Sequence, residues 1–498
     1  MMNGPGKSDR PIVPVKSPNK AGRPAAEAME GRGRPKGNPV SQTMHRTQGR
    51  ERMQRAWKRV REAGRKDRKT RLTSLFHHIT SIDALREAYC RLNRRAAPGI
   101  DGVTWKQYGA ELEANLQDLS ARLKRGGYRA KPVRRTYIPK ADGRQRPLGV
   151  TALEDKLVQT SAVETLNAVY ENDFLGFSYG FRPGRGQHDA LDALAVGIEK
   201  KRIAWVLDAD IRGFFDAIDH GWMVKFVEHR IGDQRVVRLI RKWLSAGVLE
   251  DGTLRQVEEG TPQGGSISPL LSNIYLHYVL DLWADRWRKA HAAGEVIIVR
   301  YADDFIIGFQ SKSDAERFLG ELRERLAKFS LELHPEKTRL IEFGTYAAER
   351  RLRRGLGKPE TFDFLGFTHI CGKAKNGWFQ LWRKTKRKRL QTKLHEIKIE
   401  LRRRWHEPIK QVGRWLGSVV AGHIQYYGVP YNLKALWSFR AQVTRLWRRV
   451  LERRSQRAAV SWARMARLRE RFLPPALICH PYPDQRFRAR TQGRSPVR

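Results

Sequence analysis

The sequence predicts an α+β protein in which strand hairpins alternate with helices and a basic helical region follows. Residues 296–309 (VIIVRYADDFIIGF) hold two β-branched and aromatic runs around a tight turn, which predicts a hairpin with acid at its tip. Residues 203–211 (IAWVLDADI) are typical of a buried strand. From about residue 390 the apolar residues instead recur at three- and four-residue spacing, which predicts amphipathic helices.

The composition points to a polyanionic partner. The chain holds 97 Lys and Arg against 52 Asp and Glu, a formal net charge of +45, which makes nucleic acid the leading partner class. A basic membrane-surface protein is the rival, but the basic residues are spread along the chain instead of forming one amphipathic helix. No apolar run reaches about 18 residues, so we expect no membrane partner.

The cysteines and the N-terminus fit a reducing cytoplasm. Cys90, Cys371 and Cys479 are widely separated and form no Cys-x-x-Cys pair, so neither a disulfide framework nor a zinc finger is predicted. The first residues are polar and rich in glycine, unlike a secretory signal.

Along the first 124 residues, a disordered segment is predicted to be followed by helices. Residues 1–45 are rich in Pro, Gly, Lys and Arg and are expected to be disordered when free. Residues 48–72 form a basic helical stretch, which either contacts RNA or is a solvated charged face. Two further helices are expected, one from about residue 82 to 92 and one from about 107 to 124.

A basic hairpin and an arginine-bearing loop follow. Residues 133–150 read as a hairpin with Ala-Asp-Gly at its turn, and its Lys140 and Arg146 could reach one anionic ligand. After a helix over 152–170, the glycine-rich loop 178–186 precedes another helix and places Arg182 where it could approach a phosphate or a base. A tight structural turn is the alternative for the glycines.

Two acidic pairs contain the candidate catalytic residues, which are Asp210, Asp303 and Asp304. Asp303 and Asp304 lie at the tip of the predicted hairpin, and Asp208 and Asp210 stand two apart, hence on one face of their strand. Adjacent carboxylates between apolar strands are costly to ionise unless a cation or a solvated cleft is present, and a divalent metal would resolve this. An acidic solvated turn is the alternative for the tip.

The remaining candidates lie in loops around these strands. Residues 260–273 (GTPQGGSISPLLSN) combine a flexible loop with a helix that begins after Pro269, and Gln263 and Gly264 can bring backbone close to a bound nucleotide. After a helix over 313–329, alternating apolar residues over 331–338 predict a strand. Lys337 in this segment lies near the nucleotide or the metals, or is simply an exposed lysine at the end of the strand.

Six blocks in order resemble the reverse transcriptases of group II introns, over roughly residues 70–460. They are PG-x-DG at 98–102, YGFRP at 179–183, DIRGFFD at 210–216, PQGG-x-x-SP at 262–269, YADD at 301–304 and FLGF at 364–367. The resemblance implies a right-hand polymerase, with fingers and palm followed by a helical thumb or maturase domain. The expected boundaries are 1–45 for the disordered segment, 46–200 for the N-terminal extension and fingers, 201–375 for the palm, 376–470 for the thumb and 471–498 for a basic tail.

The resemblance also implies residue roles. The expected ligands of two Mg²⁺ ions are Asp210, Asp303, Asp304 and the backbone carbonyl of Ile211, with Asp208 a doubtful further candidate. The expected nucleotide contacts are Lys140, Arg146, Phe215, Gln263, Gly264 and Lys337; a core phenylalanine is the alternative for Phe215. The expected RNA or primer contacts are Arg182, Phe364, Leu365 and Gly366, although the phenylalanines could equally be core.

The function implied is an RNA-directed DNA polymerase, a nucleotidyltransferase that also binds its group II intron RNA to assist splicing and mobility of the element. Its partners would be the intron RNA, an RNA template, a DNA primer and deoxynucleoside triphosphates, in the nucleoid of a bacterial cytoplasm; a homodimer stays open. No Cys and His cluster follows residue 470, so no endonuclease is expected. The rivals are a non-catalytic RNA-binding splicing factor and a reverse transcriptase recruited for a host task such as defence.

Overall fold

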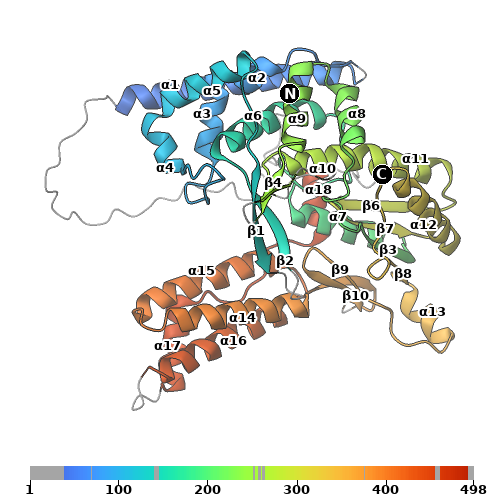
Figure 1. Ribbon diagram of the computed structural model, residues 1–498. Helices are drawn as coiled ribbons and strands as arrows, with labels where there is room; N and C mark the ends of the chain where they lie inside the picture. The colour runs from blue at the N-terminus through green and yellow to red at the C-terminus, as the bar shows by residue number, and fades with distance from the viewer. Residues whose placement is uncertain are drawn as a thin grey trace, which may run out of the picture.

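A computed structural model describes residues 39–491, except 69, 140–144, 251–252, 256–259, 261–263, 375 and 455–459. Figure 1 shows a helical N-terminal layer, a central sheet with helices on both faces, and a separate group of helices near the C-terminus. In the described part of the chain, no helix is long and apolar enough to cross a membrane.

The N-terminal layer consists of helices packed around α6. Their bounds are α1 Pro39–Lys66, α2 Phe76–Thr80, α3 Ile82–Arg91, α4 Trp105–Tyr108, α5 Leu112–Lys124 and α6 Leu153–Tyr170, with a 3₁₀ turn at Gly109–Glu111. On α1, Met53, Trp57 and Val60 share a buried face, and the Trp57 indole donates to Thr165 Oγ1 at 3.3 Å. This i, i+4, i+7 spacing is what lets a helix so rich in arginine pack at all.

The first sheet has the strand order β2-β1-β4-β5. The bounds are β1 Val133–Pro139, β2 Gln145–Val150, β4 Val248–Glu250 and β5 Thr253–Arg255. β1 and β2 form the predicted basic hairpin, and β4 adds to β1 in parallel. In Figure 1 this hairpin projects from the N-terminal layer toward the C-terminal helices.

The central sheet carries the acidic residues and has the order β6-β7-β3-β8. Its strands are β3 Trp205–Asp210, β6 Val296–Tyr301, β7 Asp304–Phe309 and β8 Arg339–Glu342, and every neighbouring pair is antiparallel. Alternate residues along these strands pack into two different hydrophobic cores. Leu207 and Ile307 face the larger core, whereas Val206 and Ile306 face the core beneath α7 (Gln187–Lys200).

Further helices follow along the chain, and all of them except α13 contribute to the larger core. They are α8 His220–Arg230, α9 Gln234–Leu244, α10 Ser268–Leu276, α11 Leu282–Ala290, α12 Lys312–Ala327 and α13 Ala347–Arg353, with a π-helical turn at His277–Asp281. α8 begins after Asp219, whose carboxylate caps the helix by accepting from Trp222 N–H at 2.6 Å.

The last third combines a small sheet with the C-terminal helices. β9 Phe362–Phe364, β10 Phe367–Lys373 and β11 Phe379–Thr385 form the sheet, and the helices are α14 Arg387–Arg403, α15 Ile409–Tyr427, α16 Leu433–Glu452, α17 Trp462–Phe472 and α18 Pro483–Thr491. Helices α14–α17 share their own core. α18 returns to pack against α7, as the red helix in Figure 1 shows.

Three sequence predictions about elements need correction. Residues 39–45 belong to α1, although the disordered segment was expected to extend to residue 45; residues 1–38 lie outside the described part. α1 ends at Lys66, not at 72. Residues 331–338 form no regular strand, because only Leu333 makes a bridge, to Ile211, and the chain then turns with Thr338 N–H donating to His334 O at 3.0 Å.

Candidate active site

The central sheet brings the two acidic blocks together. In the register of β3 and β7, Asp210 lies directly opposite Asp304. Tyr301 pairs with Asp304 across β6 and β7, so Ala302 and Asp303 form a two-residue turn at the hairpin tip. Opposed residues of antiparallel strands have Cβ atoms about 5 Å apart, so carboxylates from separate parts of the chain meet at one end of the sheet.

Burial and mutual repulsion disfavour ionisation at this site. Burial, followed by the carboxylates of Asp208, Asp303 and Asp210, raises the pKa of Asp304 to about 8. Burial likewise raises the pKa of Asp208 to about 6, although Arg339, whose Nη2 lies 3.4 Å from the Asp208 carboxylate, opposes the shift. A cluster of this kind is stabilised by added positive charge.

Lysine supplies part of that charge. The Lys337 ammonium forms an ion pair with the Asp210 carboxylate. Lys337 reaches it because the backbone of the preceding turn is fixed to β3, with His334 N–H donating to Asp210 O at 2.7 Å. The sequence prediction that Lys337 lies near the acidic site therefore agrees with the geometry, and its direct partner is a carboxylate.

The donor set suits a divalent cation. Asp210, Asp303 and Asp304 offer hard oxygen ligands, the type that Mg²⁺ prefers, and their repulsion is what a cation would relieve. Within the described ranges, no three His, Cys, Asp or Glu side chains already surround one point as metal ligands. With Lys337 on Asp210, a cation would have to displace this ion pair.

The backbone beside Asp210 leaves one carbonyl outside the strand pairing. The bridge between Ile211 and Leu333 is flanked by two hydrogen bonds, from Arg212 N–H to Glu332 O at 2.8 Å and from His334 N–H to Asp210 O. Neither bond uses the Ile211 carbonyl, so the geometry is compatible with its predicted role as a ligand.

The turn after β3 holds Phe215 next to the loop that begins at Gly260. Phe215 is half-buried and packs against the larger core, with its ring centroid 5.4 Å from that of Phe214. Gly260 N–H donates to Ile218 O at 2.7 Å, and a Cβ at Gly260 would lie 2.9 Å from Phe215 O. The loop that begins at Gly260 therefore lies directly against the backbone of Phe215.

The loop also contacts the basic hairpin. Gly264 has φ +121°, and a Cβ there would lie 2.3 Å from Gly149 O, so only glycine allows this approach to β2. Arg146 lies in β2 opposite Ile138. Lys140 and Gln263 lie outside the described residues, and their predicted contacts stay predictions.

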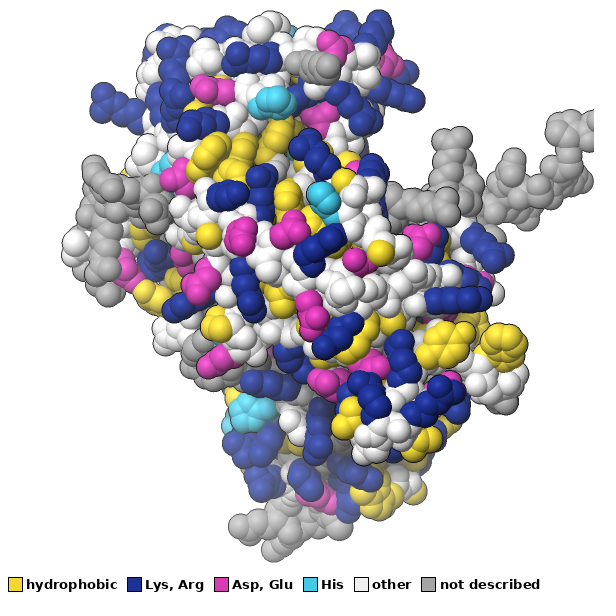
Figure 2. Space-filling view, turned by 90° about the vertical axis from the view of Figure 1, so that its right-hand side faces the viewer, with side chains coloured by type: hydrophobic (Ala, Val, Ile, Leu, Met, Phe, Trp, Pro, Cys, Tyr) yellow, Lys and Arg dark blue, Asp and Glu magenta, His cyan; other side chains and the backbone are white. Residues whose placement is uncertain are grey.

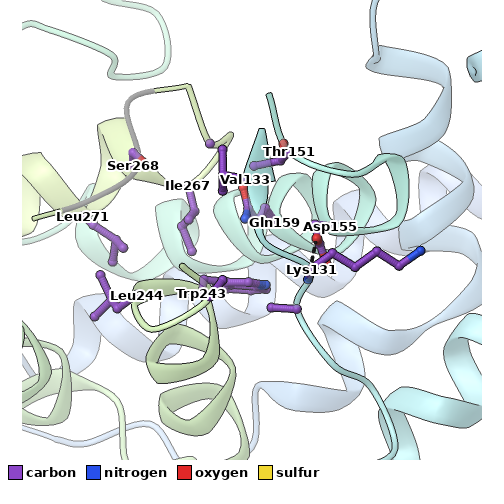
Figure 3. Close-up of a pocket in the computed structure, with 13 residues that line it drawn as sticks. Lys131, Val133, Thr151, Asp155, Gln159, Trp243, Leu244, Ile267, Ser268 and Leu271 are labelled. Carbon is purple, nitrogen blue, oxygen red and sulfur yellow. Dashed lines mark hydrogen bonds between the residues drawn. The ribbon is translucent and has the colours of Figure 1, made fainter. Parts of the chain in front are cut away.

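Figure 3 shows residues that line a cavity next to Gly265, among them Thr151, Gln159 and Ile267. The volume of this cavity is about 10 Å³. Nearby, the backbone N–H of Lys131 donates to Asp155 at 3.0 Å. The volume suits about one water molecule. The cavity is therefore far too small for a nucleotide.

A larger cavity, of about 460 Å³, joins Asp304 to the small sheet. It is lined by Gln187, Asp304, Asp363, Phe364, Leu365, Gly366, Lys386, Arg389, Tyr426 and Tyr427. Leu365 and Gly366 form a two-residue turn with φ values of +47° and +82°, and Tyr426 O–H donates to Leu365 O at 2.7 Å. Phe364 is 1% exposed and belongs to the core.

Arg182 is placed differently from the sequence prediction. Its side chain is 2% exposed, and its guanidinium donates to Glu171 at 3.0 Å and to the carbonyls of Leu175 and Ser178 at 2.7 and 2.8 Å. It also lies over the Phe174 ring. A guanidinium committed to these internal acceptors does not reach RNA, so the predicted RNA contact is wrong.

Sequence reasoning missed several charged residues at the site. Lys386 forms an ion pair with Asp363 at 2.9 Å, and Lys386 and Arg389 line the larger cavity. Arg339 of β8 adds an ion pair with Asp208, and the uncharged Tyr426 of α15 adds a hydrogen bond to the Leu365 carbonyl. The one available signal was that Lys386 and Arg389 stand at the start of the first C-terminal helix, where they are hard to distinguish among many basic residues.

Comparison with known proteins agrees with this geometry. Residues 138–369 match the family model described as reverse transcriptase (RNA-dependent DNA polymerase). Protein YkfC of Escherichia coli is 35% identical over 307 residues, which cover 55% of this chain and 81% of YkfC. The group II intron-encoded protein LtrA of Lactococcus lactis is 36% identical over 215 residues, or 42% of this chain and 36% of LtrA.

A third relative is an uncharacterized 91 kDa protein in the cob intron of Schizosaccharomyces pombe, 42% identical over 155 residues, which cover 31% of this chain and 19% of that protein. The alignment thus spans most of YkfC but little more than a third of LtrA.

The α+β fold with carboxylates gathered at a hairpin tip is the arrangement expected of a nucleic-acid polymerase. The chain belongs to the reverse transcriptase family, the RNA-dependent DNA polymerases, and over part of its length it is similar to a group II intron-encoded protein. Enzymes of this family are nucleotidyltransferases that act on nucleic acid and generally use divalent metals.

Proposed function

We propose that this protein copies RNA into DNA at the carboxylate cluster of β3 and β7, with two Mg²⁺ ions. The observation that carries the proposal is the register that sets Asp210 opposite Asp304 with Asp303 in the adjoining turn. Asp210, Asp303, Asp304 and the Ile211 carbonyl would hold the cations. When bound, two such ions activate a primer 3′-hydroxyl and stabilise the departing pyrophosphate.

The protein's own residues hold the reactants. Lys337 neutralises Asp210 in the structure, and we propose that it moves to the triphosphate when a cation takes its place. The basic β1–β2 hairpin, with Lys140 and Arg146, would close over the deoxynucleoside triphosphate. Contact between Gly264 and β2 couples this hairpin to the loop of Gln263, which would lie against the nucleotide.

The primer end is proposed to lie in the larger cavity. Leu365 and Gly366 line it next to Asp304, and Lys386 and Arg389 add positive charge suited to backbone phosphates. In the terms of a right-hand polymerase, residues 46–200 would be the N-terminal extension and fingers, 201–375 the palm, 376–470 the thumb and 471–498 a basic tail.

Binding of a group II intron RNA to assist splicing is the second part of the proposal. Figure 2 shows Lys and Arg side chains over much of one face, gathered densely at its lower end, where the C-terminal helices lie. Folded RNA offers phosphates and shape to such a surface. The support from relatives is the printed name of LtrA, a group II intron-encoded protein.

The direct test is extension of a DNA primer on an RNA template with the purified protein, Mg²⁺ and deoxynucleotides. We expect extension that stops when EDTA is added and is restored by excess Mg²⁺. A folded protein that binds the intron RNA yet extends no primer would instead support a non-catalytic splicing factor. Extension without any effect on intron splicing would favour the reverse transcriptase recruited for a host task.

A further inference from the structure

The turn that presents Asp303 has an unusual backbone. Ala302 has φ +59° and occupies the first position of the two-residue turn between Tyr301 and Asp304. Hairpin turns with a positive φ at this position favour glycine, because the left-handed region costs an L-residue about 1 kcal/mol. Something in the surrounding structure must therefore hold Ala302 in place.

Arg300 holds the turn from within the protein. Its side chain and that of Asp281 are both 0% exposed, and the guanidinium donates to the two Asp281 oxygens at 2.7 and 2.6 Å. Nη1 of Arg300 also donates to the Ala302 carbonyl at 2.9 Å. The planar fork thus links the π-helical turn that carries Asp281 to the peptide that precedes Asp303.

Asn273 of α10 links the same guanidinium to the backbone of Gly180. Its Oδ1 accepts from Arg300 Nη1 at 2.9 Å, and its Nδ2 donates to Gly180 O at 2.7 Å. A Cβ at Gly180 would lie 2.3 Å from Ala302 N, so Gly180 lies directly against the turn. Arg300 therefore hydrogen-bonds the Ala302 carbonyl, and Gly180 packs closely against the Ala302 nitrogen.

The backbone of Arg300 is fixed as well. Arg300 N–H donates to Phe177 O at 2.9 Å, and Tyr179 N–H donates to Arg300 O at 2.8 Å. These bonds join the end of β6 to the loop that carries Gly180. Main chain and side chain of one residue thus set both the position and the orientation of the turn.

We propose that Arg300, Asp281 and Asn273 are positioning residues that aim the Asp303 and Asp304 carboxylates at the metal ions. This inference rests on the proposed function. Buried ion pairs contribute little net stability compared with apolar packing, so the placement of a charged network directly beneath the ligands fits a role in geometry. Metal ligands must be held within about 0.5 Å of their working positions.

Metal affinity without turnover tests the proposal. Mn²⁺ binding would be measured by electron paramagnetic resonance of the free ion, on complexes with an RNA template, a dideoxy-terminated DNA primer and the matching deoxynucleotide. We expect Asn273→Ala, which leaves the Arg300–Asp281 pair intact, to weaken Mn²⁺ binding at least tenfold. Arg300→Lys, which keeps the charge but loses the fork, should do the same.

Arg230→Met is the matched control. Arg230 is also buried, pairs with Asp173 at 2.7 Å and donates to Thr70 O at 2.6 Å, but its contacts lie away from the hairpin. We expect it to lower the unfolding midpoint and to leave Mn²⁺ affinity unchanged.

In primer extension, Asn273→Ala should lower kcat with little change in the nucleotide KM, and raised Mn²⁺ should recover part of the rate.

Two negative results have different meanings. If the natural protein extends primers and Asn273→Ala is folded but binds Mn²⁺ within twofold of the natural affinity, the positioning role is refuted. If the natural protein neither extends primers nor binds Mn²⁺ in the complex, the proposed function itself fails.

Discussion

Phe215 tests the proposed nucleotide site at the scale of one residue. It lies five positions beyond Asp210, half-buried, against the loop that begins at Gly260. If its ring lies beneath the sugar, Phe215→Val should open space for a 2′-hydroxyl. We expect the ratio of kcat/KM for a deoxynucleotide over its ribonucleotide to fall at least tenfold, about 1.4 kcal/mol of discrimination.

The neighbouring Phe214→Leu is the control for this measurement. Phe214 is 2% exposed and lies in the core, so its replacement should reduce stability and leave sugar discrimination unchanged. An unaltered ratio in Phe215→Val would show that Phe215 is only a core residue.

Single residues also show what sequence reasoning could and could not reach. The carboxylates of Asp210, Asp303 and Asp304 could be predicted, because acid at the end of an apolar strand is a local signal. The burial of Arg182 could not, because an arginine in a glycine-rich loop has the same pattern whether it points inward or outward. Its partner Glu171 lies eleven positions earlier, at the end of another helix.

At the scale of elements, the loop that contains Arg182 is expected to depend on it for stability. Arg182→Met would leave Glu171 without this partner and would remove one of the two donors from each of the Leu175 and Ser178 carbonyls. We expect a loss of about 3 kcal/mol in the free energy of unfolding, with the RNA affinity of the folded protein unchanged. Denaturant unfolding and filter binding measure the two quantities.

The double variant Arg182→Met with Glu171→Gln is the companion experiment. Removing the uncompensated charge should restore part of the lost stability. A drop in RNA affinity in Arg182→Met without any change in stability would contradict the buried role and revive the RNA contact.

Elements with a strong local pattern were predictable, and elements that depend on distant partners were not. The hairpin of β6 and β7 and the stripes of α14–α16 follow directly from periodicity. The three-residue strands β4, β5 and β9 are too short for a period to show, and they exist because β1, β4 and β10 supply their partners. The expected strand over 331–338 was wrong because its alternation belongs to a single bridge and a turn.

For the whole molecule, buried histidines predict a loss of stability in acid. Burial lowers the pKa of His188 and His369 to about 3, and of His277 and His423 to about 4. At these four histidines the unfolded chain therefore binds more protons than the folded chain between about pH 6.5 and pH 4, whereas the raised pKa values of Asp304 and Asp208 act in the opposite direction. The stability that these histidines contribute is fully present above pH 6.5 and is lost as the pH falls through this window.

A single substitution tests this dependence. His369 is fully buried and stacks on Phe362 with ring centroids 4.7 Å apart, so His369→Phe can keep the stacking without the titrating ring. Between pH 7 and pH 5, we expect the free energy of unfolding of the variant to fall by about 2 kcal/mol less than that of the natural protein. Equal losses, measured by denaturant unfolding at both pH values, would show that His369 does not contribute.

The central claim is that the carboxylates gathered by β3 and β7 form the polymerase site. The most direct measurement is primer extension on an RNA template by Asp303→Asn, which keeps size and removes the charge. Asp118→Asn, an exposed acid on α5 that pairs with Arg122, is the control. We expect the rate to fall by several orders of magnitude in Asp303→Asn, because the electrostatic clamp on the metals supplies much of the catalysis, and to stay normal in Asp118→Asn. Extension by folded Asp303→Asn at the natural rate would contradict the account.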